Sequence, residues 1–320
     1  MPPVGEPGIG TRVSDLLGVR YPILQAPMGY IARAQLASAV SNAGGLGIIE
    51  TSSGQLDQVR GEIRAMRDLT GEPFGVNIAQ LFVRDPAEIV DFVAGEGIRF
   101  VTTSAGDPSV LTARLHDAGI TVFHVVPHLR GALKAIAAGV DGLVVEGGEG
   151  GGFKQSRDVA TMVLLPLVCE AVDVPVVAAG GIVDGRSMAA AFVLGAEGVQ
   201  MGTRMVSARE SPVHDNWKEL VVQSAETDSV VLNRWGKPAF RVLATPYSVA
   251  RERDERVAFP PLEQVLEVYF EGNLDAGFAF GGQGAGRIGS IEPVATIIER
   301  TVVEFREVLS TVASRWAERP

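Results

Sequence analysis

Eight short apolar runs, separated by helix-like segments, recur between residues 22 and 202 of the chain. The runs are largely continuous in apolar residues, which is typical of parallel strands covered by helices. Between them the apolar residues have helical spacing, as in the series Leu56, Val59, Ile63 and Met66. The sequence therefore predicts eight strands, at 22–28, 46–50, 74–78, 100–104, 121–126, 142–146, 175–180 and 198–202.

Glycines mark the places where the predicted helices end. In four places a glycine is followed by an apolar residue one to three positions before a predicted strand; these glycines are Gly97, Gly119, Gly139 and Gly195. Glycine accepts the left-handed conformation that ends many helices. An open doubly wound sheet and a closed barrel both fit alternating strands and helices, but eight units without a change of rhythm favour a (β/α)8 barrel, the TIM-barrel fold.

The regular rhythm stops after the eighth predicted strand. We expect a barrel core over 11–204 and an inserted, mainly helical lid or substrate subdomain over 205–285. The apolar face of Ile297, Ile298, Val302 and Phe305 predicts a C-terminal helix within 286–320 that completes the barrel. A barrel of about 250 residues with an insertion fits the length of the chain.

Charge and composition restrict the partners. The net charge is −10 and no basic run exceeds two residues, which argues against nucleic acid. The single cysteine, Cys169, allows no internal disulfide, and the longest apolar stretch, 159–169, is too short for a bilayer. We expect a cytoplasmic protein that acts on a small molecule, with no membrane or metal, and we leave a homodimer open.

In a barrel of this kind, function lies in the loops after the strands. Gly180 ends the seventh predicted strand and Gly181 follows it, and Gly202 ends the eighth, with Thr203 directly after it. Two neighbouring glycine turns, each leading into a helix, can direct backbone amides at a phosphate group. We therefore predict a phosphate site here, to which Arg204 would add a positive charge.

Three other loops have unusual compositions. Ala26, Pro27 and Met28 follow the first strand and leave backbone that can lie flat against a ring, while Asn77 offers a donor and an acceptor to the edge of a heterocycle. Residues 147–152 contain five glycines, which indicates a mobile loop that passes close to a ligand. Glu149 and Gly151 of this loop are therefore counted among the candidate cofactor contacts.

Several segments carry a resemblance to a known family. Gln-Ala-Pro-Met at 25–28, Gly-Val-Asn at 75–77, Ala-Gly-Gly-Ile at 179–182, Met-Gly-Thr-Arg at 201–204 and Gly-Gln-Gly-Ala-Gly-Arg-Ile at 282–288 together resemble the nitronate monooxygenases, once called 2-nitropropane dioxygenases. Asn-Ala-Gly-Gly-Leu-Gly at 42–47 is similar to them as well. FMN-type enoyl-acyl-carrier-protein reductases and NADH:quinone reductases belong to the same superfamily.

The resemblance implies an FMN cofactor at the barrel mouth. It places Ala26, Pro27, Met28 and Asn77 at the isoalloxazine ring. It gives the phosphate to Gly180, Gly181, Gly202 and Thr203, and it closes Gln283 over the ring.

One position departs from the family pattern. Members of the family typically read Glu-x-x-Gly-His in the loop after strand six, with the histidine as the catalytic base. The same frame here runs from Glu149 to Phe153, so the resemblance implies that Phe153 stands in place of the histidine. Phenylalanine cannot accept a proton, so another group would have to act as base. The candidates are Lys154, expected to be an exposed loop residue; His124, which faces either the barrel interior or the helices; and His128, which could equally be a surface residue.

Three functions remain open from the sequence. An anionic nitronate is already deprotonated and needs no base, so FMN-dependent oxidation of alkyl nitronates with O₂ is the first expectation. A reductase that takes NAD(P)H as co-substrate and acts on a quinone or an enoyl thioester is the alternative, because hydride transfer needs only positioning. A flavin-binding protein without turnover is the third.

Overall fold

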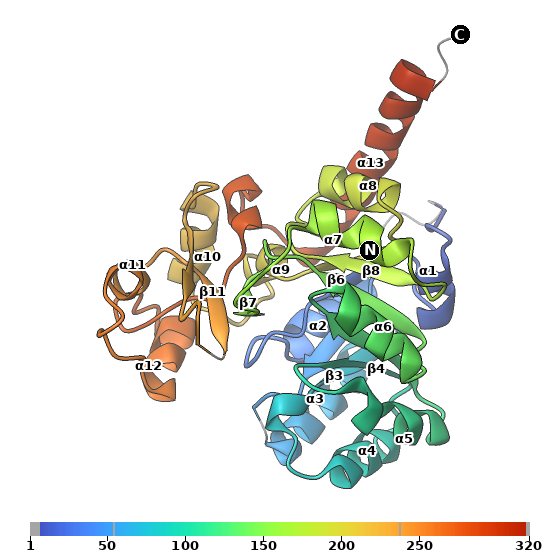
Figure 1. The fold of residues 1–320 in the computed structure, drawn as a ribbon, viewed down its shortest axis with the longest axis horizontal. Helices are drawn as coiled ribbons and strands as arrows, with labels where there is room; N and C mark the ends of the chain where they lie inside the picture. The colour runs from blue at the N-terminus through green and yellow to red at the C-terminus, as the bar shows by residue number, and fades with distance from the viewer. Residues whose placement is uncertain (1–6, 54, 237, 318–320) are drawn as a thin grey trace.

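A closed barrel of parallel strands forms the centre of the molecule in the computed structural model, which describes residues 7–53, 55–236 and 238–317 (Figure 1). The strand order is β1-β9-β8-β6-β5-β4-β3-β2. A bridge between Leu24 and Leu46 closes the ring, and Gln25 Nε2 donates to the carbonyl oxygen of Ile48 across the same junction at 3.2 Å. The strands are β1 (Ile23–Gln25), β2 (Gly47–Glu50), β3 (Phe74–Ala79), β4 (Phe100–Ser104), β5 (Thr121–Val126), β6 (Gly142–Glu146), β8 (Val176–Ala179) and β9 (Gly198–Met201).

The predicted (β/α)8 barrel is therefore confirmed, and the strands begin and end within three residues of the predicted positions. Alternate strand residues, among them Leu24, Phe100 and Phe123, fill the barrel interior. The short helix α1 (Arg12–Leu17) adds Val13 and Leu17 to this interior cluster. The remaining strand residues point outward and pack against helices, so both strand faces are apolar.

Helices surround the barrel, and glycines end several of them as predicted. Gly97, Gly119, Gly139 and Gly195 all have positive φ, between 66° and 102°. The outer helices are α2 (Ala34–Asn42), α3 (Leu56–Leu69), α4 (Pro86–Gly95), α5 (Thr112–Asp117), α6 (Leu129–Ala137), α7 (Thr161–Cys169), α8 (Gly185–Val193) and α13 (Val294–Val312).

Helix α13 is the last outer helix and packs against α8 and α2. Its predicted apolar face is buried, with Ile297, Ile298, Val302 and Phe305 each at most 5% exposed. Its C-terminal part extends beyond the barrel (Figure 1). Within the described ranges, no helix is both long and apolar enough to cross a membrane.

The inserted region lies to one side of the barrel (Figure 1). Its helices are accompanied by a β-hairpin that the sequence did not indicate. This hairpin pairs with β7 (Gly152–Lys154), a short strand from the loop after β6, so one sheet joins the insertion to the barrel. The elements are α9 (Thr203–Val206), α10 (Asp215–Gln223), β10 (Ser229–Leu232), β11 (Ala239–Leu243), α11 (Pro246–Arg253) and α12 (Leu262–Leu266), with single helical turns at Gln80–Phe82, Pro108–Val110, Glu267–Glu271, Gln283–Arg287 and Ala313–Ala317.

Candidate functional site

The two glycine turns lie side by side at the carboxyl end of the barrel. Strands β8 and β9 are neighbours, with Ala179 opposite Gln200, so the turns that follow them are adjacent. Gly180 and Gly181 have φ of 89° and 77°, a conformation that glycine adopts readily. A Cβ atom on Gly180 would lie 2.9 Å from the carbonyl oxygen of Gly147, so the turn has no room for a side chain.

Backbone amides in these turns are available to a ligand. Among the hydrogen bonds of the described residues, the amides of Gly181, Gly202 and Thr203 donate to no protein acceptor. Buried or half-buried amides normally find a partner. Neighbouring unpaired amides at a helix start are suited to an anion such as phosphate.

Arg204 does not add its charge to this group of amides. Its guanidinium is buried and bonds Glu292 at 2.7 Å, Ser207 Oγ at 2.9 Å and the carbonyl oxygen of Ser290 at 2.8 Å. Desolvation lowers the pKa of Arg204 against the opposing effect of Glu292. The expectation that Arg204 supports the phosphate is wrong, because α9 turns this side chain toward the segment before α13.

The turn after β1 packs against the turn after β9. The amide of Ala26 donates to the carbonyl oxygen of Met201 at 2.9 Å, and a Cβ on Gly202 would lie 3.4 Å from Ala26 Cβ and 4.0 Å from Met28 Sδ. Residues 26–28 are half-buried. The structure therefore brings Ala26, Pro27 and Met28 beside the unpaired amides.

Polar side chains point inward at the ends of several barrel strands. Asn77 is 3% exposed, and its Nδ2 donates to Thr102 Oγ1 at 2.9 Å. Gln200 is 7% exposed, and its Oε1 has no hydrogen-bond partner among the described residues. The residues before and after each of them in the strand pack outside the barrel against the helices. Asn77 and Gln200 therefore face the barrel interior, beneath the glycine turns. Gln200 was missed from the sequence, although a polar residue at the last inward position of a strand is a usable signal.

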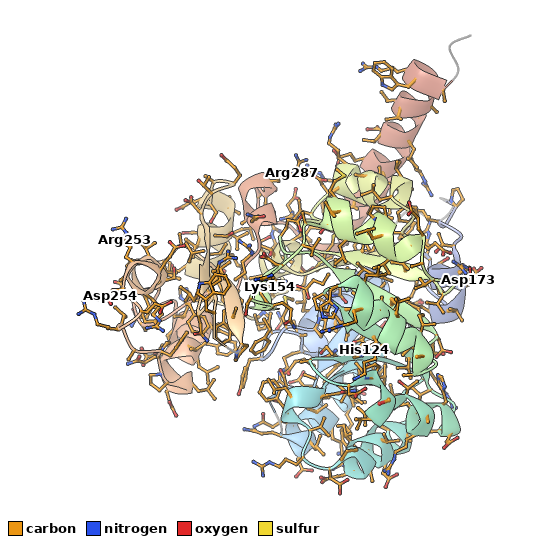
Figure 2. The ribbon with its side chains drawn as sticks, viewed as in Figure 1. His124, Lys154, Asp173, Arg253, Asp254 and Arg287 are labelled. Carbon is orange, nitrogen blue, oxygen red and sulfur yellow. The ribbon has the colours of Figure 1, made fainter. Side chains whose placement is uncertain are left out.

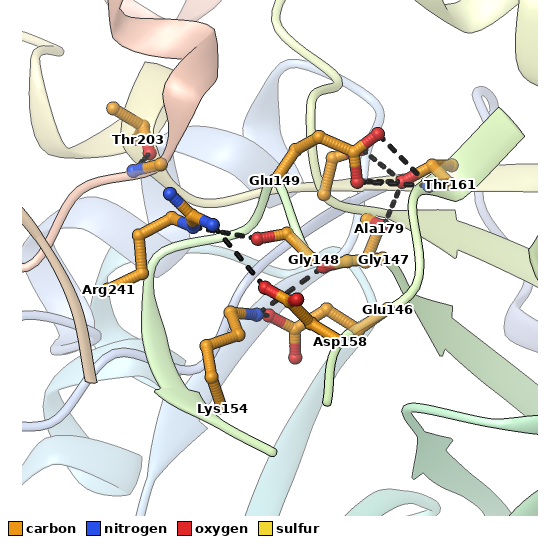
Figure 3. A network of polar contacts seen from close by, with 12 residues as sticks. Glu146, Gly147, Gly148, Glu149, Lys154, Asp158, Thr161, Ala179, Thr203 and Arg241 are labelled. Carbon is orange, nitrogen blue, oxygen red and sulfur yellow. Dashed lines mark hydrogen bonds and ion pairs between the residues drawn. The ribbon is translucent and has the colours of Figure 1, made fainter. Parts of the chain in front are cut away.

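The glycine-rich loop after β6 takes part in a network of polar contacts (Figure 3). Glu149 accepts hydrogen bonds from Thr161 N and Thr161 Oγ1, each at 2.9 Å, and Arg241 Nε donates to the carbonyl oxygen of Gly148 at 2.7 Å. The amide of Gln283 donates to the carbonyl oxygen of Glu149 at 2.9 Å. Both the barrel and the insertion therefore bond this segment, and the mobility of the loop stays a prediction.

The predicted contacts Glu149, Gly151 and Gln283 thus meet in one place. The Glu149 carboxylate is used by Thr161, and the Gln283 side chain is exposed. A Cβ on Gly151 would lie 2.8 Å from the carbonyl carbon of Gly281, so the two glycine segments touch. The amide of Gly282 donates to Thr203 Oγ1 at 2.9 Å. The glycine segment around Gly282 therefore also contacts the turn after β9, where we predicted the phosphate site.

Lys154 is buried and not the exposed loop residue that the sequence favoured. Its side chain, labelled in Figure 2, is 5% exposed. It forms an ion pair with Glu146 at the end of β6 (Figure 3). A Cβ on Gly150 would lie 2.9 Å from Lys154 Nζ, so the loop covers the pair. Lys154 therefore fixes the loop to the barrel.

We expect Lys154→Met to destabilise the protein by about 2 kcal/mol, because it leaves the partly buried Glu146 carboxylate without a counterion. The double variant Glu146→Gln/Lys154→Met should recover part of this loss. Urea unfolding measures both. Lys134→Met is the control, because the Lys134–Asp107 pair is about half exposed and should contribute under 1 kcal/mol. Equal losses in the two lysine variants would contradict the assignment.

Phe153 lies in a cluster of rings between the barrel and the insertion. Its ring centroid is 6.4 Å from that of Phe82, 5.4 Å from Phe240 and 6.2 Å from Phe280. It is nevertheless 44% exposed. Along β7 the side chains alternate, so Phe153 faces these rings while Lys154 points to Glu146.

His124 lies between the barrel and its helices, on the outer face of β5. Its neighbour Phe123 belongs to the interior cluster, and its Nδ1 bonds Thr103 Oγ1 at 2.7 Å on the outer face of β4. Burial lowers the pKa of His124 to about 4, against the opposing effect of Asp107. The imidazole is therefore neutral at pH 7, and it is directed away from the barrel interior.

His124 should make stability depend on pH. In the unfolded chain its imidazole takes up a proton near pH 6.5, but in the folded chain only near pH 4. The unfolded state therefore binds more protons in between, and the free energy of unfolding should fall by up to about 3 kcal/mol as pH drops through this window. Urea unfolding should show a flatter pH profile for His124→Asn than for His116→Asn. Identical profiles would refute this role.

The other candidate base, His128, caps a helix. Its Nδ1 accepts a hydrogen bond from the amide of Gly131 at 2.8 Å, at the start of α6. A cap at this position stabilises the helix. Cys169, the single thiol, is half-buried in α7, and burial raises its pKa to about 11, so it is a poor nucleophile.

The residues at the barrel mouth fit a flavin. The unpaired amides of Gly181, Gly202 and Thr203 suit its phosphate, and the orphaned Gln200 Oε1 is an acceptor for a ring N–H group. Asn77 Nδ2 donates hydrogen bonds to Thr102, and the side-chain oxygen of Asn77 remains as a further acceptor for the ring.

Comparisons with known proteins identify the family of the chain. A family model described as nitronate monooxygenase matches residues 10–304. A probable nitronate monooxygenase of Staphylococcus saprophyticus is 30% identical, over 94% of this chain and 99% of that protein. FabK from Thermotoga maritima has a TM-score of 0.89 at 38% identity, covering 96% of this chain and 99% of that chain.

A further relative differs in its named activity. A (3aS,4S,5R,7aS)-5-hydroxy-7a-methyl-1-oxo-octahydro-1H-indene-4-carboxyl-CoA dehydrogenase of Mycobacterium tuberculosis is 40% identical over 238 residues, which are 73% of this chain. The match spans about two thirds, 66%, of that relative's own length. The barrel, the mouth residues and these matches agree, so the chain is a flavin-dependent oxidoreductase that belongs to the nitronate monooxygenase family.

Proposed function

We propose that the protein is an FMN-dependent oxidoreductase that transfers a hydride between NAD(P)H and the carbon–carbon double bond of an acyl thioester. The observation that carries this proposal is Phe153, a half-exposed ring at the position where the resemblance to the family implies a catalytic histidine. Without that base, chemistry that depends on positioning is favoured over removal of a proton from a neutral nitroalkane.

Different residues at the barrel mouth would bind the phosphate, orient the ring and exclude water. The amides of Gly181, Gly202 and Thr203 would bind the FMN phosphate. Asn77 and Gln200 would orient the ring edge from inside the barrel, and Phe153 would exclude water on the substrate side. When bound, FMN supplies the capacity to accept and to donate a hydride.

Relatives support the thioester as substrate. The mycobacterial dehydrogenase acts, by its name, on a CoA thioester and is 40% identical, whereas the staphylococcal probable nitronate monooxygenase is 30% identical. The resemblance to enoyl reductases of the superfamily points the same way.

Nitronate oxidation is the second candidate function. Membership of the nitronate monooxygenase family favours it, and a preformed nitronate needs no base. On this alternative the same residues would hold FMN, and O₂ would complete the reaction.

Anaerobic flavin reduction tests the proposal. The FMN-loaded protein is mixed with NADH, NADPH or propionate 3-nitronate, and flavin absorbance is followed. We expect fast bleaching by one nicotinamide and recovery of the oxidised spectrum when an enoyl-CoA is added. Bleaching by the nitronate alone would favour the second candidate, and no bleaching by any donor would indicate a flavin-binding protein without turnover.

A further inference from the structure

Six phenylalanines form a cluster where the barrel meets the insertion, which we call the aromatic rim: Phe82, Phe153, Phe240, Phe259, Phe278 and Phe280. They come from distant segments of the chain. Phe82 follows β3, Phe153 lies in β7, and the others belong to the inserted region. Ring centroids of neighbouring members lie between 5.2 and 6.5 Å apart.

The aromatic rim adjoins the proposed flavin site through the chain itself. Phe153 comes two residues after Gly151, and Phe280 comes two residues before Gly282, which bonds Thr203. Phe82 ends the helical turn that follows β3, the strand that carries Asn77. A molecule that contacts the flavin from this side would therefore also meet the rim.

Part of the aromatic rim is open to a ligand. Phe82 is 42% exposed, Phe153 44% and Phe259 37%, whereas Phe278, which contacts Phe259, is only 7% exposed. The three rings around Phe153 are tilted by 45° to 49° to it, so no ring of the cluster stacks flat on its face. Exposed rings gathered beside a reactive site typically mark the place of an apolar ligand group.

Two cations near the aromatic rim, Lys154 and Arg251, already have partners. Lys154 points to Glu146, and the guanidinium of Arg251 lies over Phe259 at 4.6 Å from its centroid. Neither Lys154 nor Arg251 is therefore left to bind a carboxylate or a phosphate at the open rings of Phe82 and Phe153. An uncharged, wide and flat group is the better fit, because it can stack on tilted rings from two sides.

We propose that Phe82 and Phe153 are specificity-determining residues that bind an apolar ring on the acyl part of the substrate. The proposal rests on the proposed function and names its substrate class: ring-bearing acyl thioesters in preference to short-chain ones. Phe153 then acts as a binding surface for the acyl ring at the position that the family gives to a base.

Binding of two thioesters tests this proposal separately from turnover. Oxidised, FMN-loaded protein is titrated calorimetrically with crotonyl-CoA and with cyclohex-1-ene-1-carbonyl-CoA, which share the CoA part. We expect the ring compound to bind about tenfold more tightly, given the additional apolar carbons that it buries. Phe82→Ala and Phe153→Ala should each reduce this preference to about twofold.

Phe270→Ala is the matched control, because Phe270 is 42% exposed but lies outside the rim and contacts Tyr269. It should keep the full preference. Equal affinity of the wild type for the two thioesters, or a preference that survives both rim substitutions, would overturn the proposal. Selective binding of the ring compound without its reduction by NADH or NADPH would instead count against the proposed function and leave the rim assignment standing.

Discussion

Replacing Gly181 with aspartate should lower the affinity for FMN by more than 100-fold. The carboxylate would stand beside the unpaired amides that we assign to the phosphate, and it would both compete for them and repel the anion. A loss of two charge-assisted hydrogen bonds, at about 1.5 kcal/mol each or more, is sufficient for this effect. Calorimetric titration of the apoprotein with FMN measures it.

Gly181→Asn is the control for this substitution. A Cβ at Gly181 would lie 3.6 Å from Glu149 Cβ, an ordinary contact, and both asparagine and aspartate tolerate positive φ better than other residues. The two variants therefore differ chiefly in charge. We expect Gly181→Asn to lose affinity only a few-fold. If both variants lose FMN equally, the phosphate does not lie at this turn.

Replacing Phe153 with histidine should raise kcat/KM for neutral nitroethane at least 100-fold. An imidazole at this position would supply the general base that the resemblance to the family implies here, and such a base typically contributes a factor between about 10² and 10⁴. The rate should rise with pH through about 6.5, as an ordinary imidazole loses its proton. Oxygen uptake with nitroethane over a pH series is the measurement.

Two comparisons isolate the effect of the base. Ethyl nitronate, already deprotonated, should gain far less than nitroethane in the Phe153→His protein. Phe153→Leu removes the ring without adding a base and should show no gain with either compound. A histidine variant that matches the leucine variant would show that residue 153 does not face the reacting carbon.

The barrel was predictable because its signals are local and repeated. A continuous apolar run such as 142–146 predicts its own strand, and a glycine such as Gly97 or Gly139 predicts the end of the helix before it. Neither signal depends on residues far away in the sequence. The hairpin formed by β10 and β11 was not predictable in this way. It is stabilised by pairing with β7, which lies far away in the sequence.

The candidate site was only partly predictable for the same reason. The glycine turns at Gly181 and Gly202 have a local signature, and the structure brings them together. The direction of a side chain depends on its partner: Arg204 turns to Glu292 and Lys154 to Glu146, and neither partner is marked in the sequence. The face of His124 follows from barrel register, which alternation alone leaves undecided.

The central claim is that the adjacent turns after β8 and β9 bind the phosphate of a flavin. Parallel titration of the wild-type apoprotein with FMN and with riboflavin, which lacks the phosphate, tests this claim most directly. We predict that FMN binds at least 100-fold more tightly than riboflavin. Equal affinities for the two flavins, or no binding of either, would contradict the account.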